Sequence, residues 1–454
     1  MPSKKIVCLG AGSVYFPRAL GDLAINQGLA GSEVTLYDID LDKAQTMARL
    51  GQRLAKESGT GLKVRACAGL ADAVDGADFA LSSIGGAGPT LGRVYGSAAH
   101  RADIGIPAKY GIYQIIGDTG GPAGMMMALR SIPIYLSICA EMAKRCPEVI
   151  VFNHSNPMAV LCRAMVKHSP IRNVIGICHG VQGGIMRVAE LLKVEPEELD
   201  VTWIGTNHYH WFTRIRLHGK DVYPEVMALA KAAATNPHEQ MSWKLTEAYG
   251  YCLTYPDDSH TVEFYSYGTQ AKGFDELPYA LGEQAKEFHE AEEGGTPATA
   301  KEQAGLRAKA LAAFEERLSH RDLPPPEVSF IRGEGIATLL EGIATGARQV
   351  RILNLPNRGM VPNLPDYAIL EAEAVTDSCG ARGIYVGDAP MALKGLLEKR
   401  IAWQELVADA AATGSRRLAL QALLTDEMAI RPELAEQMLD ELLAASREYL
   451  PQFG

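Results

Sequence analysis

The chain has 454 residues, which is long for a single hydrophobic core, so two closely packed lobes are expected. Apolar residues make up 47% and charged residues 22%, the balance of a globular enzyme and not of a disordered or fibrous chain. The formal net charge of −10 argues against a broad surface that binds the phosphate backbone of nucleic acids.

Neither a secretion signal nor a membrane span is expected. The apolar run at residues 6–9 stops at a glycine, with no small-residue cleavage site after it. No stretch of about 18 uninterrupted apolar residues occurs. The eight cysteines follow no framework typical of a secreted domain, so we expect them to be reduced and mostly buried. These features indicate a cytoplasmic protein with no membrane partner.

The first 180 residues alternate strand-like and helix-like segments, which is the βαβ pattern of a parallel sheet covered on both faces. Residues 40–57 predict a helix, because Ala44, Met47, Leu50 and Leu54 recur at helical spacing. The strand-like segments are residues 4–10, 33–39, 63–68, 78–84, 148–153 and 173–179. A Rossmann-like, doubly wound parallel sheet is the economical arrangement.

The pattern changes near residue 195, so we divide the chain into a Rossmann domain over residues 1–194 and an α+β domain over residues 195–454. In the second domain, β-structure is expected at 200–220 and 347–377, helices at 283–321 and 390–450, and a loop at 292–302. The expected turns within 347–377 lie at Pro356, Pro362 and Pro365. The apolar periodicity of Leu434, Met438, Leu439 and Leu442 fits either a core or an interface between subunits.

A glycine-rich turn follows the first predicted strand. Gly10 and Gly12 permit the tight turn and close backbone approach that a pyrophosphate requires, and Ser13 belongs to the same turn. The third glycine of the usual pattern is absent, so a turn that uses glycine only for packing is the alternative. The second predicted strand ends near Asp38 and Asp40, and an acidic residue there accepts hydrogen bonds from ribose hydroxyls and repels a 2′-phosphate. This arrangement predicts an NAD site.

Two further segments lie at the expected carboxyl edge of the sheet. Ile84 and Gly85 begin a second glycine cluster, which brings the backbone near the cofactor or forms a simple loop. Asn153 and Asn156 follow the fifth predicted strand, where their amides suit cofactor or sugar hydroxyls, although an Asn-Pro pair is also typical of a plain turn. We expect Asn153 to contact the cofactor and Asn156 the substrate.

Cys178 and His208 are the candidate metal ligands. Cys178 directly follows a predicted strand, and His208 lies in the histidine-rich segment 205–211. A thiolate and an imidazole together bind a divalent transition metal and leave positions open for substrate oxygens. A lone cysteine or histidine is as readily a packed core residue, so composition leaves both interpretations open.

Seven segments spread along nearly the whole chain together resemble glycoside hydrolase family 4, the NAD- and metal-dependent glycosidases. They are GAGS, YDID, NHSNPM, GICHGVQGG, GTNHYHWF, HTVEF and NLPNRGMVPNLPDYAILE. The block at residues 110–135 is most similar to the α-galacturonidase-like branch. The resemblance implies a lactate/malate dehydrogenase-like fold, an NAD cofactor, a divalent metal such as Mn²⁺, and a homodimer or homotetramer.

The implied reaction is hydrolysis by a redox route. NAD takes a hydride from C3 of the sugar, and the resulting ketone acidifies the proton on C2. A base removes that proton while the metal holds the O2 and O3 oxygens, and the substituent on C1 is then eliminated. Water adds to C1 and the hydride returns, so the cofactor is recycled. This route is an exception to the usual pair of glycosidase carboxylates.

The resemblance also implies roles for individual residues. Cys178 and His208 match the metal ligands, and His179 matches an acid that assists the leaving group. Asp258 matches the base at C2, with the adjacent Asp257 as its alternative. The expected substrate-binding residues are Asn156, Asp118 and His260, the last being open to a role behind the metal ligands instead.

The expected substrate is a glycoside that is anionic at C6, a uronide such as an α-galacturonide first and a sulfoquinovoside second. Arg101, Lys109 and Arg358 are the candidate partners of that anion. The residues that read a 6-phosphate in the phosphoglycosidase branch are not recognisable. Two other classes stay open, namely a 2-hydroxyacid dehydrogenase of the lactate/malate type and a nucleotide-sensing protein that has lost the chemistry.

Overall fold

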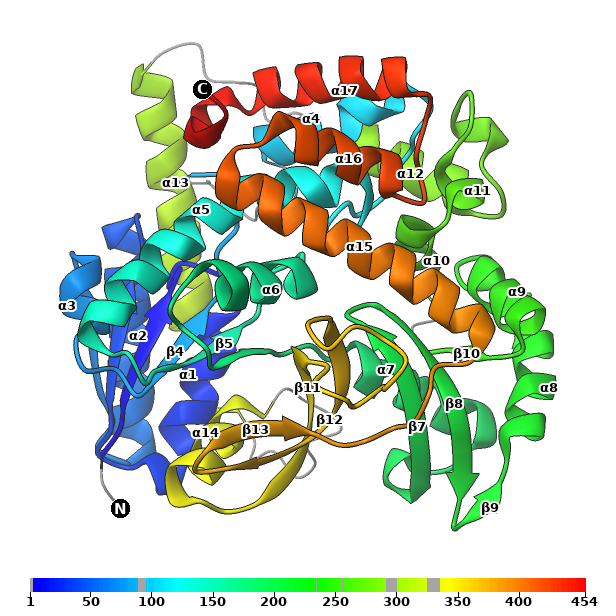
Figure 1. The fold of residues 1–454 in the computed structure, drawn as a ribbon. Coiled ribbons are helices and arrows are strands. Elements are labelled where there is room, and N and C mark those ends of the chain that lie inside the picture. Colours follow the sequence, from blue (N-terminus) through cyan, green and yellow to red (C-terminus); the bar gives the residue numbers. More distant parts are fainter. Residues whose placement is uncertain are drawn as a thin grey trace.

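Six parallel strands form one side of the nine-stranded large sheet, in the order β3-β2-β1-β4-β5-β6 with β3 at the edge (Figure 1). The computed structural model describes residues 3–88, 95, 97–233, 235–254, 257–290, 300–324 and 335–454. The strands are β1 (Lys5–Leu9), β2 (Glu33–Tyr37), β3 (Lys63–Cys67), β4 (Phe79–Ser82), β5 (Ile150–Asn153) and β6 (Val174–Gly176). This order is that of doubly wound, dinucleotide-binding sheets. All six strand predictions are confirmed, because strands buried on both faces are written as short apolar runs.

Helices cover both faces of these strands. They are α1 (Phe16–Ile25), α2 (Leu41–Ser58), α3 (Leu70–Val74), α4 (Ala98–Ala108), α5 (Gly121–Arg145), α6 (Met158–His168) and α7 (Gly180–Leu192). Ile6 and Cys8 of β1 belong to the core that contains α1 and α2, whereas Val7 and Leu9 belong to the core that contains α5 and α6. This alternation follows from the two-residue period of a strand. The helix predicted over residues 40–57 is confirmed as α2.

Strands from the second half of the chain extend the same sheet. They are β7 (Leu199–Thr206), β8 (Tyr209–Leu217), β9 (Lys220–Asp221), β10 (Cys252–Leu253), β11 (Gln349–Pro356), β12 (Ile369–Asp377) and β13 (Gly380–Gly383). β11 pairs antiparallel with β6 and is followed by β12 and β13, while β7, β8, β9 and β10 form a separate antiparallel sheet. The large sheet therefore contains strands from both of the predicted domains.

The remaining helices lie in the second half. They are α8 (Tyr223–Ala233), α9 (Gln240–Tyr249), α10 (Asp258–Thr261), α11 (Ser266–Thr269), α12 (Leu281–Glu290), α13 (Ala300–Ser319), α14 (Ile336–Thr345), α15 (Met391–Thr413), α16 (Arg416–Thr425) and α17 (Pro432–Ala445). The β-structure and helices predicted there are confirmed. Pro356 ends β11, and Pro362 and Pro365 lie in the turn before β12. The loop predicted at 292–302 lies outside the described residues as far as residue 299, and α13 begins at residue 300.

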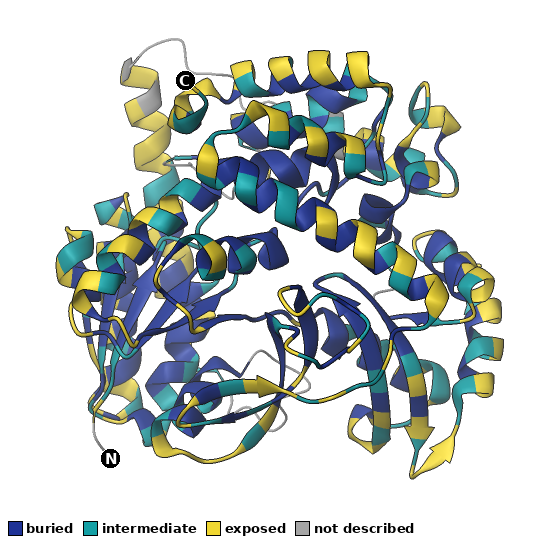
Figure 2. Cartoon of the chain, in the orientation of Figure 1, coloured by how far each residue is buried: buried dark blue, intermediate teal, exposed yellow. Residues whose placement is uncertain are grey.

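The apolar periodicity of the last long helix belongs to a core. Met438, Leu439 and Leu442 of α17 are buried together with residues of α5 and α15. Seven of the eight cysteines are buried, Cys379 is exposed, and none of the eight forms a disulfide, as predicted. Among the described residues, α5 is long and apolar enough to cross a membrane by composition, but 72% of its most apolar window is buried inside the protein. Figure 2 shows how the central strands are enclosed.

Candidate active site

The turn after β1 allows close approach of the backbone. Gly10 has a φ of +78°, and the amides of Gly10 and Ala11 donate to the Tyr37 carbonyl at 2.9 and 3.0 Å. A Cβ on Gly10 would lie 2.3 Å from the carbonyl oxygen of Ser83, so a side chain does not fit there. The Ser13 hydroxyl lies 2.7 Å from that of Ser83. The turn is thus held between the ends of β2 and β4.

Two acidic residues follow β2 and differ in their partners. Asp38 accepts hydrogen bonds from the amides of Gly12 and Asp40, each at 2.8 Å, and is half-buried beside the glycine turn. Asp40 instead caps α2, and its carboxylate lies 2.7 Å from the guanidinium of Arg307 on α13. Asp38 therefore occupies the place of the acid that binds ribose hydroxyls in Rossmann folds, and Asp40 ties α13 to this edge.

The ends of β4 and β5 are joined by a buried network. The Ile84 amide donates to the Ser155 hydroxyl at 2.7 Å, and Gly85 follows at the same edge of the sheet. The Asn153 side chain accepts from the Tyr135 hydroxyl at 2.8 Å and donates to the Ser155 carbonyl at 2.9 Å. Both the oxygen and the nitrogen of the Asn153 amide thus form hydrogen bonds within the protein, and these bonds order the segment that carries Ser155.

Cys178 and His208 come together from two separate elements. Cys178 lies between β6 and α7, where the Gly180 amide is 3.3 Å from its sulfur, and the amino end of a helix favours a thiolate. His208 stands at the tip of the two-residue β7–β8 turn with a φ of +61°. Cys178 Sγ and His208 Nε2 lie 3.4 Å apart. Burial lowers the pKa of His208 to about 4, which keeps the ring in the neutral form that binds metals.

This separation fits a shared metal ion. Ligand atoms at about 2.3 Å for sulfur and about 2.1 Å for nitrogen, held at about 90–109°, lie about 3.1–3.6 Å apart. Among the described residues, no group of three or more His, Cys, Asp or Glu side chains is arranged to hold a metal. Cys178 and His208 would supply two ligands to such an ion.

Thr119 and, through it, Asp118 contact the His208 ring at Nδ1, the nitrogen that faces away from Cys178. Thr119 Oγ1 lies 3.2 Å from His208 Nδ1 and donates to Asp118 Oδ1 at 2.5 Å. The Asn156 amide donates to Asp118 Oδ2 at 2.8 Å. Burial raises the pKa of Asp118, but His208 and His260 lower it more, so the carboxyl is held below its ordinary pKa. The structure thus brings Asp118 and Asn156, two of the predicted substrate residues, beside His208.

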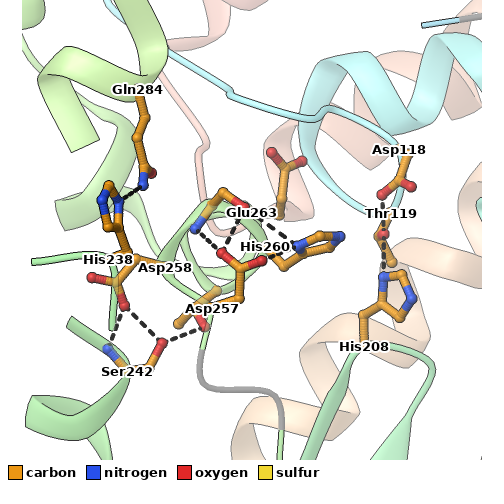
Figure 3. A network of polar contacts seen from close by, with 12 residues as sticks. Asp118, Thr119, His208, His238, Ser242, Asp257, Asp258, His260, Glu263 and Gln284 are labelled. Carbon is orange, nitrogen blue, oxygen red and sulfur yellow. Dashed lines mark hydrogen bonds and ion pairs between the residues drawn. The ribbon is translucent and has the colours of Figure 1, made fainter. Parts of the chain in front are cut away.

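Asp258 points away from this group. Its carboxylate is buried and accepts from the amides of Met241 and Ser242, each at 2.8 Å, and from the Ser242 hydroxyl at 2.7 Å. These groups lie at the start of α9, so Asp258 satisfies the free amides of that helix end. Figure 3 shows Asp258 directed toward Ser242. These contacts indicate that Asp258 caps α9, and they do not indicate a base at C2.

Asp257 and His260 lie on the side of the metal pair. His260 Nδ1 is 3.1 Å from Asp257 Oδ2, and the centroids of the His260 and His208 rings are 5.2 Å apart. Figure 3 shows His260 between Asp257 and His208. The Asp257 side chain is 43% exposed. Burial lowers the pKa of His260, but the hydrogen bond to Asp257 and the charge of Asp118 raise it more, so the net pKa is raised. The pair is an accessible acid–base couple.

Glu263 and Gln114 were missed in the sequence. Glu263 is fully buried and accepts from the Gln114 amide at 2.7 Å and from the Gly117 amide at 3.1 Å. Burial and the nearby Asp118 raise its pKa to about 7. Glu263 joins the segment that carries His260 to the segment that carries Asp118. The signal for Glu263 was an acid between Val262 and Phe264 in an apolar run.

The other predicted residues are placed as follows. His179 is exposed at the start of α7, next to Cys178. Lys109 forms an ion pair with Glu441 at 2.7 Å. Arg358 lines a cavity of about 340 Å³ with Arg172, at the start of β6 and so at the opposite edge of the sheet from Cys178. Arg358 therefore lies toward the other edge of the sheet from the Cys178–His208 pair, and its role as a partner of the sugar anion stays a prediction.

Known proteins match along the whole chain. An α-glucosidase of Erwinia rhapontici is 30% identical, with 98% of each chain covered, and an α-galacturonidase of Bacillus subtilis (strain 168) is 30% identical, with 97% of this chain and 96% of that protein covered. The solved 6-phospho-β-glucosidase of Thermotoga maritima, with manganese, NAD⁺ and glucose 6-phosphate, has a TM-score of 0.75 at 23% identity and covers 98% and 99% of the two chains.

The fold is also that of lactate dehydrogenases. The enzyme of Eimeria maxima has a TM-score of 0.51 at 13% identity, with 91% of this chain and 96% of that chain covered, which confirms the predicted superfold. The model of the family 4 glycosyl hydrolases matches residues 5–194, and that of the C-terminal domain of the same family matches residues 203–429. The chain therefore belongs to family 4 of the glycosyl hydrolases.

Proposed function

We propose that this chain is an NAD- and divalent-metal-dependent glycosidase that cleaves glycosides with an anionic group at C6, uronides first. The observation that carries the proposal is the 3.4 Å separation of Cys178 and His208 at the same carboxyl edge as the Gly10 turn. That edge is where doubly wound sheets bind their ligands. The solved relative named above holds NAD⁺ and manganese on the same fold.

The residues of the chain divide the work. When bound, NAD supplies a reversible hydride transfer at C3, and the metal stabilises negative charge on the sugar oxygens. The Gly10–Ser13 turn and Asp38 hold the dinucleotide, and Cys178 and His208 hold the metal. Asn156 and Asp118, which are hydrogen-bonded to each other beside His208, are the proposed contacts to the sugar hydroxyls.

The Asp257–His260 pair is the proposed base for the C2 proton, in place of Asp258. An aspartate that orients a histidine is a recurring arrangement for proton transfer, and the contacts of Asp258 with α9 leave its carboxylate occupied. His179, exposed beside Cys178, is positioned to protonate the leaving oxygen on C1. Water then adds to C1, and the proton taken from C2 is returned.

The substrate assignment rests on the relatives and on the sequence. Proteins named α-galacturonidase from Bacillus subtilis and Thermoanaerobacter italicus align with nearly the whole chain, at 30% and 27% identity. Proteins named α-glucosidase and α-galactosidase align equally well, so a neutral sugar is the competing substrate class. A sulfoquinovoside is the second anionic candidate, because a sulfonate at C6 presents the same charge to an arginine or a lysine.

A panel of aryl glycosides tests the proposal. Purified protein with NAD and Mn²⁺ is offered the 4-nitrophenyl α-galacturonide, sulfoquinovoside, glucoside and galactoside, and release of nitrophenol is followed together with absorbance at the NADH band. We expect release from the uronide that needs both NAD and Mn²⁺, without net NADH. Steady accumulation of NADH with a 2-hydroxyacid would instead identify a dehydrogenase. Release from only the neutral sugars would overturn the anionic substrate.

A further inference from the structure

A buried carboxylate holds the hairpin that carries His208. Glu371, on β12, is 1% exposed, and its Oε2 accepts a hydrogen bond from the Asn207 amide at 3.0 Å. His210 Nε2 lies 3.5 Å from the same oxygen, and both side chains of that pair are fully buried. Asn207 and His210 lie on either side of His208 in the chain, so one carboxylate holds both flanks of the metal ligand.

The backbone of β12 supports the same hairpin. The Trp203 indole donates to the Glu371 carbonyl at 2.8 Å, and the Thr206 hydroxyl donates to the Ile369 carbonyl at 2.9 Å. These contacts attach the small sheet of β7 and β8 to the edge of the large sheet. Cys178 follows β6 of the large sheet, so the distance between Cys178 and His208 depends on this attachment.

The tip of the hairpin is not held by its own backbone. His208 has a φ of +61°, a conformation that is uncommon for residues other than glycine and costs energy unless its surroundings enforce it. The strand pairing ends at Thr206 and Tyr209, so Asn207 and His208 lie beyond it. A side-chain anchor on Asn207 therefore holds the backbone next to His208, whose ring also meets Thr119 Oγ1 at 3.2 Å.

Burying a carboxylate is costly, and here its partners are the Asn207 amide and the His210 imidazole. A charged group that is removed from water loses several kcal/mol unless hydrogen bonds replace the solvent. A hydrophobic residue at the same place on β12 would fill the space without that cost. We propose that Glu371 is a positioning residue, which orients the β7–β8 hairpin so that His208 meets the metal beside Cys178. The proposal rests on the metal role of that pair in the proposed function.

Direct titration with Mn²⁺ tests this role apart from catalysis. Free Mn²⁺ is measured by electron paramagnetic resonance with protein saturated with NAD, for the wild type, Glu371→Ala, Glu371→Gln and Glu373→Gln. Groups behind metal ligands typically contribute about 10- to 100-fold in affinity, and that loss is expected for Glu371→Ala. Glu371→Gln should recover part of it, because its amide oxygen still accepts from Asn207. Glu373→Gln, exposed on the same strand, should bind as the wild type does.

The outcomes separate this inference from the function on which it rests. If the wild type binds no Mn²⁺, the proposed function falls, and the inference with it. If the wild type binds Mn²⁺ and both Glu371 variants bind it with the affinity of the wild type, only the inference falls. That holds even when the variants unfold at a lower temperature. Should Glu371→Ala fail to fold, Asn207→Ala removes the same contact from the hairpin side, and unchanged Mn²⁺ affinity in it and in Glu371→Gln overturns the inference.

Discussion

The proposed active site has a cofactor half and a metal half, and the two are built in different ways. The cofactor half is a turn between neighbouring strands, where the backbone amides of Gly10 and Ala11 bind the Tyr37 carbonyl and Gly12 binds Asp38. The metal half joins a strand end and a hairpin tip that are 30 residues apart and belong to different sheets. The first half depends on backbone conformation and the second on the placement of side chains, so substitutions should separate the two functions.

The largest expected effect is that of Cys178→Ser. Serine keeps the shape but lacks the thiolate, so we expect glycosidase activity to fall about 1000-fold and Mn²⁺ affinity at least about 10-fold. NAD affinity, measured by fluorescence titration, should stay within about twofold, because the glycine turn is separate. Equal losses of NAD and metal affinity would contradict the division of the site into two halves.

Asp257→Asn should come next. General acid–base groups typically contribute about 100- to 10,000-fold in kcat, and we expect about a 100-fold loss here because the carboxylate that orients His260 is removed while the His260 ring itself remains. The readout is exchange of the C2 proton of the sugar into deuterated water, followed by NMR. Affinities for Mn²⁺ and NAD should be those of the wild type. Normal exchange in this variant would remove Asp257 from the proton transfer.

Gly10→Ala should disable the cofactor half alone. Alanine at a φ of +78° is strained, and its Cβ would approach the Ser83 carbonyl, so the turn must shift. The cost of about 1–3 kcal/mol corresponds to about 5- to 150-fold in NAD affinity. Ser13→Ala, which loses the contacts of its hydroxyl with the Ser83 hydroxyl and the Tyr15 amide, is the milder control. Wild-type NAD affinity in Gly10→Ala would show that the dinucleotide binds elsewhere.

Thr119→Val should weaken the metal half without abolishing it. Valine keeps the volume of threonine but breaks the contact with His208 Nδ1 and the hydrogen bond to Asp118. We expect about a 10-fold loss of Mn²⁺ affinity, as is usual for groups behind metal ligands. The thermal unfolding temperature serves as the check on stability. A loss of stability with unchanged Mn²⁺ affinity would assign Thr119 to packing.

Asp258→Asn should have the smallest effect on chemistry and a visible effect on stability. The asparagine keeps one acceptor for the start of α9 and loses the charge, so we expect about 1–2 kcal/mol less unfolding free energy in urea. Activity should stay within about threefold once the variant is folded. A 100-fold loss of C2 exchange at wild-type stability would instead restore Asp258 as the base.

The cofactor half could be found in the sequence because its constraints are local. Gly10 and Gly12 directly follow a buried strand, and Asp38 directly follows the next, so the strand pattern alone placed them together. Cys178 and His208 were candidates from residue type and position alone, and the family resemblance favoured metal binding over a packed core. Neither the sequence pattern nor the family resemblance could decide whether Asp257 or Asp258 is the base at C2, because neighbouring residues at a helix start point in different directions.

The amino-acid sequence by itself determined the parallel sheet, its covering helices and the glycine turn, since apolar runs and φ-permissive glycines act on their immediate neighbours. The tertiary structure decided which side chains meet. It set Asp258 against the amides at the start of α9 and joined Glu263 to the amide of Gly117. It also joined Glu371 to Asn207 in the hairpin that carries His208. Those contacts span long stretches of chain, and their geometry depends on packing between elements that no local pattern encodes.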